Sequence, residues 1–231
     1  MIRWTDDGPL RAVTLDRPDR RNAFTPEGLD DLERAVTGAD APVVYLHGAG
    51  AAFSAGADLD VVADLDDPAG FAWHGQRVAD AIANAEAVVV AGIDGAARGG
   101  GVELALACDL RVATPDATFA ETGVKLGLFG AWGGTVRLPE IVGTGDAADL
   151  ALSGRVVDAE EALRMGLVSR VVEDPRAVAD ELADNDPSAL AAIKARLRDD
   201  ADRGTRLERE AEAFGRLHAE HRDRLRSNRK D

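Results

Sequence analysis

The chain has 231 residues and a formal net charge of −15, and 45% of its residues are hydrophobic. This length and hydrophobic content suffice for one substantial α/β domain, and they exclude a largely disordered chain. The negative charge argues against nucleic-acid and membrane partners, because nucleic acids and anionic membranes repel an acidic surface.

The sequence also lacks signals for membrane insertion and export. It has no apolar run of about 18 residues, so we expect no transmembrane span. The segment Met1–Asp7 has no apolar stretch of a secretory signal. The single cysteine, Cys108, excludes an internal disulfide and fits a reducing compartment. We therefore expect a cytoplasmic protein.

The charged residues are biased toward Asp and Arg: the chain has 28 Asp and 14 Glu, and 24 Arg and 3 Lys. An Asp-rich, Lys-poor surface is typical of proteins kept soluble in high salt, where screening weakens the repulsion between carboxylates. We therefore predict a halophilic source. The alternative is an ordinary acidic cytosolic protein encoded in a GC-rich genome.

Strands and helices are expected to alternate over the first half of the chain. Thr25 followed by Pro26 marks a helix start, since Thr is a good N-cap and Pro fits the first helical position. Strands are expected at 12–15, 43–46, 87–93 and 110–113, helices after 25 and at 71–85 and 102–108, a turn at 16–19, and loops at 48–57 and 60–70. This order predicts stacked β-α units with mostly parallel pairing.

From about residue 146 onward the pattern is helical. Asp158 is expected to cap a helix that ends near Gly166, and Pro187 opens a helical tail reaching about residue 226. We therefore expect a core domain over residues 1–185 and a helical C-terminal region over residues 186–231.

Two segments of small residues could polarise a carbonyl group with backbone N–H donors. In Phe53–Leu59, small side chains would let a ligand approach the main chain and meet the Ala57 N–H. Gly99–Gly101 open a helix, so their N–H groups lie at the positive end of its dipole. Together these segments predict an oxyanion hole.

Glu103 lies in the first turn of the same helix, where it could move a proton beside the polarised group. Each of these features also has a purely structural alternative. The glycines could form only a tight connection, and Glu103 could only complement the helix dipole.

Other chemistries find little support. The segment His47–Phe53 resembles a dinucleotide-binding turn, but Phe53 stands at the third glycine position. No G-x-S-x-G sequence surrounds Ser54, so it is a poor nucleophile candidate. The histidines form no H-E-x-x-H motif, so we predict no metal, and we expect His218 and His221 to be solvated.

Several motifs stand in order along the chain: Leu15–Phe24 (LDRPDRRNAF), Phe53–Leu59 (FSAGADL), Gly99–Asp109 (GGGVELALACD), Gly133–Pro139 (GGTVRLP) and Ala159–Val168 (AEEALRMGLV). In this order they resemble the crotonase superfamily, the enoyl-CoA hydratases and isomerases. The resemblance covers residues 10 to 172. It implies an α/β core built as a spiral of β-β-α turns, with a helical C-terminal region that forms a homotrimer or a dimer of trimers.

The resemblance also implies a substrate and its binding residues. It assigns the N–H groups of Ala57 and Gly100 to the thioester carbonyl of an acyl-CoA, with no cofactor apart from the coenzyme A of the substrate. The substrate-binding residues that it implies are Asn22, Ala23, Phe24, Ala55, Ala57, Asp58, Leu59 and Gly100. A lysine is frequent in the family after ADL, and here Asp60 stands there, so contacts to the CoA phosphates must come from arginines.

One position departs from the family pattern. Family hydratases use two glutamates, of which the first matches Glu103, and an ungapped alignment of Phe119–Gly127 puts Gly123 at the second. The usual family proline is Gly130. Three interpretations follow: Glu121 substitutes for the missing glutamate, Glu103 acts alone, or the protein binds acyl-CoA without turnover. A surface or interface salt bridge is the structural alternative for Glu121.

We therefore predict an enoyl-CoA hydratase-like lyase of fatty-acid metabolism that works through an oxyanion-stabilised enolate. The predicted catalytic residues are Glu103, Ala57, Gly100 and Glu121, and residues 60–75 with Trp73 are expected to shape the acyl pocket. The alternatives are an isomerase, a decarboxylase or a thioesterase of the same fold, and a non-catalytic acyl-CoA-binding protein.

Overall fold

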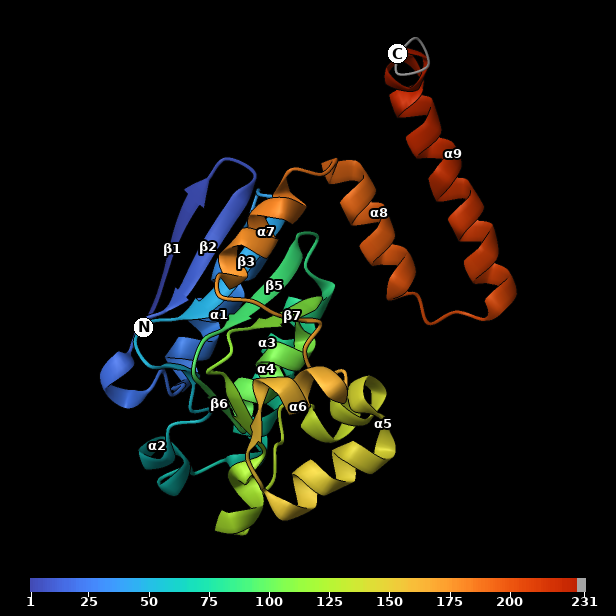
Figure 1. Cartoon of the computed structure of the whole chain (residues 1–231). Helices are drawn as coiled ribbons and strands as arrows, with labels where there is room; N and C mark the ends of the chain where they lie inside the picture. Colours follow the sequence, from blue (N-terminus) through green and yellow to red (C-terminus); the bar gives the residue numbers. More distant parts are fainter. Residues whose placement is uncertain (228–231) are drawn as a thin grey trace. The chain divides into compact units, whose positions relative to one another are not determined.

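The computed structural model describes residues 1–227, which fall into two compact units. The first unit, Met1–Asp184, contains every strand of the described residues, and the second, which begins at Asn185, is helical. Along the first unit strands and helices alternate (Figure 1). No helix of residues 1–227 combines the length and the apolar character needed to cross a bilayer.

The strands of the first unit are β1 (Ile2–Asp7), β2 (Leu10–Leu15), β3 (Val43–Gly48), β4 (Ala52–Ser54), β5 (Val88–Ile93), β6 (Ala96–Arg98), β7 (Leu110–Ala113), β8 (Thr118–Ala120), β9 (Val157–Asp158) and β10 (Arg170–Val171). Its α-helices are α1 (Pro26–Thr37), α2 (Leu59–Ala63), α3 (Pro68–Asn84), α4 (Gly100–Ala107), α5 (Gly134–Ser153), α6 (Ala159–Arg164) and α7 (Pro175–Ala183). Two short 3-10 helices are η1 (Pro18–Arg20) and η2 (Thr122–Leu126). The second unit contains α8 (Pro187–Leu197) and α9 (Arg203–Ser227).

The strands form two sheets, one in the order β1-β2-β3-β5-β7-β10 and one in the order β4-β6-β8-β9. Apart from the antiparallel pairs β1–β2 and β8–β9, the pairing is parallel. Each strand of the large sheet from β3 to β7 is followed directly by one of the small sheet, and a helix then closes the turn. This confirms the predicted spiral of β-β-α turns.

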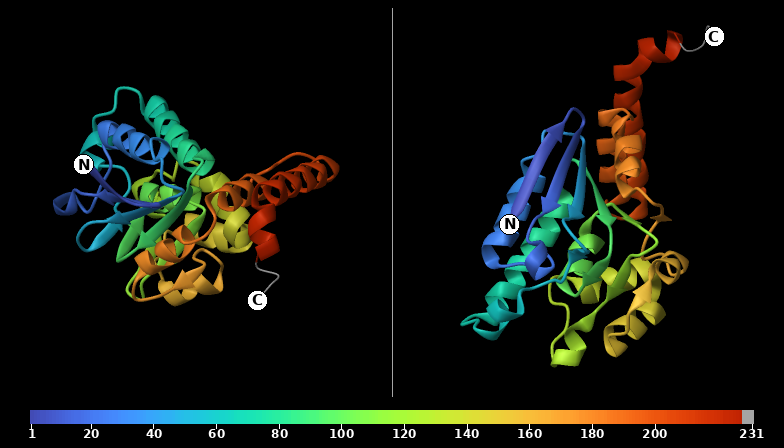
Figure 2. Two further views of the ribbon diagram at one scale, coloured as in Figure 1. Left: turned by 90° about the horizontal axis from the view of Figure 1, so that it is seen from above. Right: turned by 60° about the vertical axis from the view of Figure 1, so that its left-hand side comes forward.

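The central strands of the large sheet, β2, β3 and β5, are buried on both faces. Side chains alternate along a strand, so Val44 and Leu46 of β3 join the main core while Val43 and Tyr45 point to the opposite face. Helices α1 and α3 pack side by side (Figure 2), and α7 packs on β2, β3, β5 and β7. Burial on both faces explains why these strands read as continuous apolar runs.

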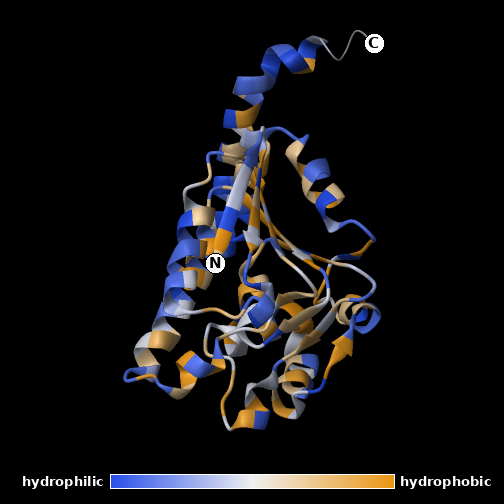
Figure 3. Ribbon diagram, turned by 90° about the vertical axis from the view of Figure 1, so that its left-hand side faces the viewer, coloured by the Kyte–Doolittle hydropathy of each residue, from blue (hydrophilic) through white to orange (hydrophobic). Residues whose placement is uncertain are grey.

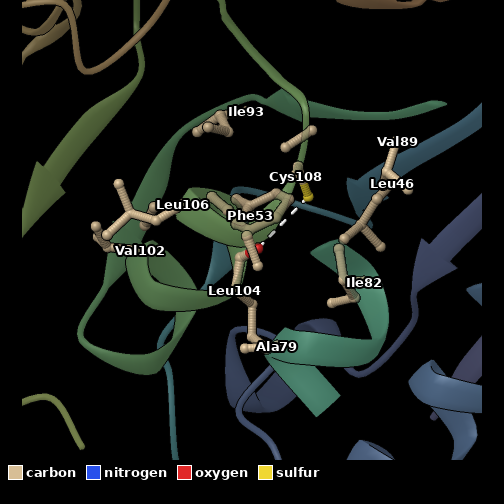
Figure 4. Close-up of a cluster of buried hydrophobic side chains, with 14 of the residues drawn as sticks. Leu46, Phe53, Ala79, Ile82, Val89, Ile93, Val102, Leu104, Leu106 and Cys108 are labelled. Atoms are coloured by element: carbon tan, nitrogen blue, oxygen red, sulfur yellow. Dashed lines mark hydrogen bonds between the residues drawn. The ribbon is translucent and has the colours of Figure 1, made fainter. Parts of the chain in front are cut away.

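Helix α4 carries Glu103 through the middle of this core. All eight of its residues are buried, and Leu104 and Leu106 pack near Phe53 and Ile82 (Figure 4). A helix that is apolar around its whole circumference belongs inside a protein. Its one carboxylate is therefore forced into an environment with little water.

Two predicted helix starts are confirmed by their caps. The Thr25 hydroxyl accepts the Gly28 N–H at 3.2 Å, and the Asp158 carboxylate accepts the Glu161 N–H at 2.8 Å. The expected loop at 60–70 is wrong, because α2 and the start of α3 fall inside it. The helical region begins at residue 134 and not at 146, and it breaks at Gly143, whose φ is 78°.

The predicted helical tail consists of two helices, because residues 198–202 separate α8 from α9. Asp199 stabilises this break by accepting the Ala201 N–H at 3.2 Å and pairing with Arg209 at 2.8 Å. His221 is not simply solvated: its Nε2 lies 3.1 Å from the Ser188 hydroxyl, at the start of α8. Helix α9, next to the C-terminal label, is mostly hydrophilic along its length (Figure 3).

Candidate active site

A pocket of about 200 Å³ lies where the loop after β4 meets the start of α4. Of the residues predicted to bind substrate or to act in catalysis, it is lined by Ala55, Ala57, Leu59, Gly100 and Glu103. Apolar side chains complete its wall, among them Val62, Leu65, Phe71, Leu126, Leu128 and Trp132. The structure thus brings the two predicted segments to one pocket.

The backbone N–H groups of Ala57 and Gly100 are neighbours in this pocket. Gly56 has a φ of 85°, and a Cβ added to it would lie 2.8 Å from the Gly100 nitrogen, so only glycine allows this approach. Within residues 1–227, neither the Ala57 nor the Gly100 N–H has a hydrogen-bond acceptor. Two adjacent free donors, one at a helix N-terminus, are the elements of an oxyanion hole.

Trp132 covers the start of α4. A Cβ added to Gly100 would lie 2.3 Å from its indole ring, which explains the glycine at this position. Phe24 and Phe71 pack edge-on against the indole, with ring centroids 6.2 and 5.6 Å away. These aromatic rings keep water from the donors, and fewer competing waters strengthen a hydrogen bond to a ligand oxygen. Trp132 was not among the residues predicted for the site.

Glu103 is 2% exposed and is held in place by the main chain. Its Oε1 accepts the N–H groups of Trp132 and Gly134, both at 2.7 Å. Burial raises the pKa of Glu103 to about 7, while these two hydrogen bonds act in the opposite direction. A carboxyl group with this pKa can take up or release a proton at neutral pH.

Glu121, which follows β8, is 6% exposed, and neither of its carboxyl oxygens has a hydrogen-bond partner among residues 1–227. A Cβ added to Gly130 would lie 2.9 Å from Oε1 of Glu103 and 2.9 Å from Oε2 of Glu121. The two carboxyl groups therefore border one small space. Burial, and next the charge of Glu103, raise the pKa of Glu121 to about 9. Glu121 forms no salt bridge within residues 1–227, so the alternative of a surface salt bridge is wrong.

Gly123, at the place of the family's second glutamate, also lines the pocket. A Cβ added there would meet the Phe129 backbone at 3.0 Å, so this position leaves little room for a side chain. Of the three interpretations of the departure, the geometry favours the one in which Glu121 supplies the second carboxyl group.

Four of the predicted substrate-binding residues lie beneath the pocket and do not line it: Asn22, Ala23, Phe24 and Asp58. The Asn22 side chain donates to the carbonyl groups of Ala52 and Ala49 at 2.8 and 3.0 Å, which fixes the loop before β4. Asp58 accepts hydrogen bonds from Arg17 at 2.6 Å and Arg20 at 2.9 Å. These residues shape the main chain of the site, and their contact with coenzyme A stays a prediction.

Residues 60–75, which were expected to shape an acyl pocket, contribute side chains other than Trp73 to the lining of this pocket. Trp73 is 70% exposed and does not line the pocket, whereas Val62, Leu65 and Phe71 do. Within the described part of the chain, no three His, Cys, Asp or Glu side chains are grouped to hold a metal ion.

Comparison with known proteins identifies the family. A sequence profile described as Enoyl-CoA hydratase/isomerase matches residues 7–228. The short-chain-enoyl-CoA hydratase of Clostridium acetobutylicum is 34% identical over 226 residues, covering 90% of this chain and 86% of that protein. The crotonyl-CoA hydratase of Syntrophomonas wolfei is 35% identical over 223 residues, covering 89% and 85%.

Solved structures show the same relationship. The enoyl-CoA hydratase from Thermoplasma volcanium superimposes with a TM-score of 0.88 at 31% identity, covering 94% of this chain and 92% of that one. An enoyl-CoA hydratase from Bacillus anthracis gives 0.88 at 30% identity, covering 97% and 96%. The chain therefore belongs to the enoyl-CoA hydratase/isomerase family, within the crotonase superfamily.

Proposed function

We propose that this protein is an enoyl-CoA hydratase, a lyase that adds water across the double bond of an enoyl-CoA thioester. The observation that carries the proposal is the pair of buried carboxyl groups at Gly130 beside the free N–H groups of Ala57 and Gly100. The names of the relatives, short-chain-enoyl-CoA hydratase and crotonyl-CoA hydratase, support the same reaction.

The N–H groups of Ala57 and Gly100 receive the thioester carbonyl oxygen. As water adds to the β-carbon, negative charge moves onto that oxygen and an enolate forms. Donors that already point to the oxygen need no reorganisation, and each contributes about 3 kcal/mol to stabilisation of the transition state. Trp132 and Phe71, which line the pocket, increase this contribution by excluding water.

The two glutamates divide the proton transfers. Glu103, fixed by two N–H donors and with a pKa of about 7, takes a proton from water as the oxygen bonds to the β-carbon. Glu121, with a pKa of about 9, is protonated at neutral pH and donates its proton to the α-carbon. Transfer of a proton from Glu103 to Glu121 across the space at Gly130 then restores the starting state, so the net change is addition of one water.

The rival functions draw less support from this geometry. The missing glutamate at Gly123 supports a non-catalytic binder, and the buried carboxyl group of Glu121 argues against that interpretation. An isomerase, a decarboxylase or a thioesterase would use the same N–H donors. Two adjacent carboxyl groups of different pKa fit the two proton transfers of hydration, one from water and one to the α-carbon.

We also propose that the protein works in the cytoplasm in fatty-acid metabolism as a homotrimer or a dimer of trimers, assembled through residues 186–231. Exposed apolar side chains on α8 and α9 support the assembly: Ile193, Leu197, Leu207, Phe214 and Leu225. A helical pair with this much exposed apolar surface is suited to packing against another copy. Light scattering of the full chain measures the mass, and a monomer would contradict the assembly.

The substitution Glu103→Gln tests the reaction. Crotonyl-CoA is incubated with the protein, and mass spectrometry follows the gain of one water with coenzyme A retained. We expect a loss of about 10²- to 10⁴-fold in kcat, because Gln cannot accept the proton of water. The exposed residue Glu86 provides the control Glu86→Gln, which should keep full activity. Full activity of Glu103→Gln would overturn the assignment.

A further inference from the structure

A second cavity, of about 280 Å³, meets the pocket at Phe129 and Gly130. We call it the tail cavity. Its wall comes from η2, α5 and the segment between them, and its apolar members include Val124, Phe129, Leu138, Ala147, Ala151 and Leu152. Among the described residues that line it, Glu121 is the only charged one. The tail cavity is therefore a hydrocarbon-lined space with one carboxyl group at its wall.

The two glutamates stand on opposite sides of the junction. Glu103 lines the pocket and not the tail cavity, while Glu121 lines the tail cavity and not the pocket. Both carboxyl groups reach the space in front of Gly130. A double bond that contacts both must therefore lie at this junction.

The position of the thioester then sets the direction of the chain. The Ala57 and Gly100 N–H groups hold the carbonyl oxygen inside the pocket. The α- and β-carbons, placed between Glu103 and Glu121, follow at the junction. The tail cavity opens from the same junction, at Phe129 and Gly130, and offers the carbons beyond the β-carbon an apolar space outside the pocket.

Glu121 gives an independent sign that this space receives a ligand. Its carboxyl oxygens are buried, point to the tail cavity and have no hydrogen-bond partner in residues 1–227. A buried polar group without a partner is costly and rare, unless a ligand or water completes it. The apolar wall without a basic side chain fits an uncharged hydrocarbon.

We propose that the tail cavity binds the hydrocarbon chain of the acyl group beyond the β-carbon, so that medium-chain enoyl-CoA thioesters are preferred substrates. This inference rests on the proposed hydration reaction and names its substrate class. In the competing arrangement the chain bends back among Leu65, Phe71 and Leu126 of the pocket. In that case the double bond does not reach Glu121.

Binding of saturated acyl-CoA thioesters tests the proposal without depending on turnover. Titration calorimetry compares decanoyl-CoA with butyryl-CoA on the full chain. We expect decanoyl-CoA to bind at least about tenfold more tightly, because added methylenes are buried in an apolar cavity. The substitution Ala151→Phe fills the tail cavity from α5 and should remove most of this preference. Ala148→Leu, at an exposed lining position, repeats the test with a smaller side chain.

The matched control is Ser153→Phe, an exposed position on α5 that does not line the tail cavity, and it should keep the preference for decanoyl-CoA. Retained butyryl-CoA binding shows that each variant is folded. If Ala151→Phe and Ala148→Leu leave the preference unchanged while Leu65→Trp removes it, the chain lies in the pocket and the proposal is wrong. Absence of hydration in the wild type, with these binding results intact, would overturn the proposed reaction alone.

Discussion

Two carboxyl groups near the oxyanion hole are almost equally buried but have opposite surroundings. Asp58 is 2% exposed and accepts hydrogen bonds from Arg17, Arg20 and the Asp60 N–H. Burial acts to raise the pKa of Asp58, but these bonds hold it below its ordinary value. Glu121 is 6% exposed, has no hydrogen-bond partner in residues 1–227, and has a pKa raised to about 9.

The contrast shows that burial alone does not distinguish a structural carboxylate from a reactive one. Asp58 is ionised and paired, so it fixes the turn at Arg17 and the start of α2. Glu121 keeps its proton because ionisation in a buried site without a donor is unfavourable. Such a group destabilises the fold and persists where its chemistry is needed.

Among the changes that test this contrast between Asp58 and Glu121, the largest effect is expected from Glu121→Gln, which removes the proton donor and keeps the shape. We predict a loss of about 10²-fold in kcat/KM for hydration. In the wild type, kcat/KM should rise as pH passes about 7, where Glu103 loses its proton, and fall above about 9, where Glu121 loses its own. In Glu121→Gln the alkaline fall should disappear. Rates across pH 6 to 10 provide the measurement, with the exposed Asp116→Asn as the control.

This prediction is contradicted if Glu121→Gln keeps the wild-type rate and the wild-type pH profile. Glu103 would then act alone, and Glu121 would be a buried group of the fold without a catalytic role.

Stability should change in opposite directions at the two positions. Asp58→Asn leaves Arg17 without its charged partner in a mostly buried site, and we expect it to lower the free energy of unfolding by about 2 kcal/mol. Glu121→Gln should raise that free energy by about 2 kcal/mol at neutral pH, because the native wild type must hold a proton that its unfolded chain releases. Urea unfolding at several pH values measures both.

The pH dependence separates these two effects. The pKa of Asp58 is lowered on folding, so its contribution exists above its ordinary value of 3.8 and is lost as pH falls through the lower folded value. The difference in the free energy of unfolding between wild type and Asp58→Asn should therefore disappear at acidic pH. The pKa of Glu121 is raised from 4.5 to about 9, so the advantage of Glu121→Gln should grow between these values. If the differences in the free energy of unfolding between wild type and each variant do not change with pH, the assigned ionisation states are contradicted.

Those parts of the site that depend only on neighbouring residues in the sequence could be predicted. The donors Ala57 and Gly100 lie in segments of small residues, and Glu103 is fixed to one of them by helical spacing. The position of Glu121 in the site has no local signal, because it depends on the pairing of β8 with β6, the strand before α4, and on the space at Gly130.

Helix α2 and the break between α8 and α9 were missed because they, too, depend on contacts between distant residues. The short helix α2 lies in an acidic stretch that reads as a loop, and its N-cap Asp58 is paired with Arg17, distant in the sequence. The break between α8 and α9 depends on Asp199 and its partner Arg209, which a helical pattern does not reveal. The apolar strands and capped helices each carry a local pattern, which predicted stacked β-α units with parallel pairing, whereas the spiral of β-β-α turns was predicted only from the resemblance to the crotonase superfamily.

The smallest effect is expected from salt, and it extends the comparison from buried to exposed carboxylates. The 42 acidic residues outnumber the 27 Arg and Lys by 15, so the repulsion of this excess negative charge should oppose folding at low ionic strength. We predict that molar KCl raises the melting temperature by a few degrees, about 1 kcal/mol in stability. The buried pair of Asp58 and Arg17 is screened less, so the gap between wild type and Asp58→Asn should stay the same in both salts. Equal melting temperatures of the wild type at low and high salt would argue against adaptation to a saline cytoplasm, and would leave the acidic surface as a feature of composition alone.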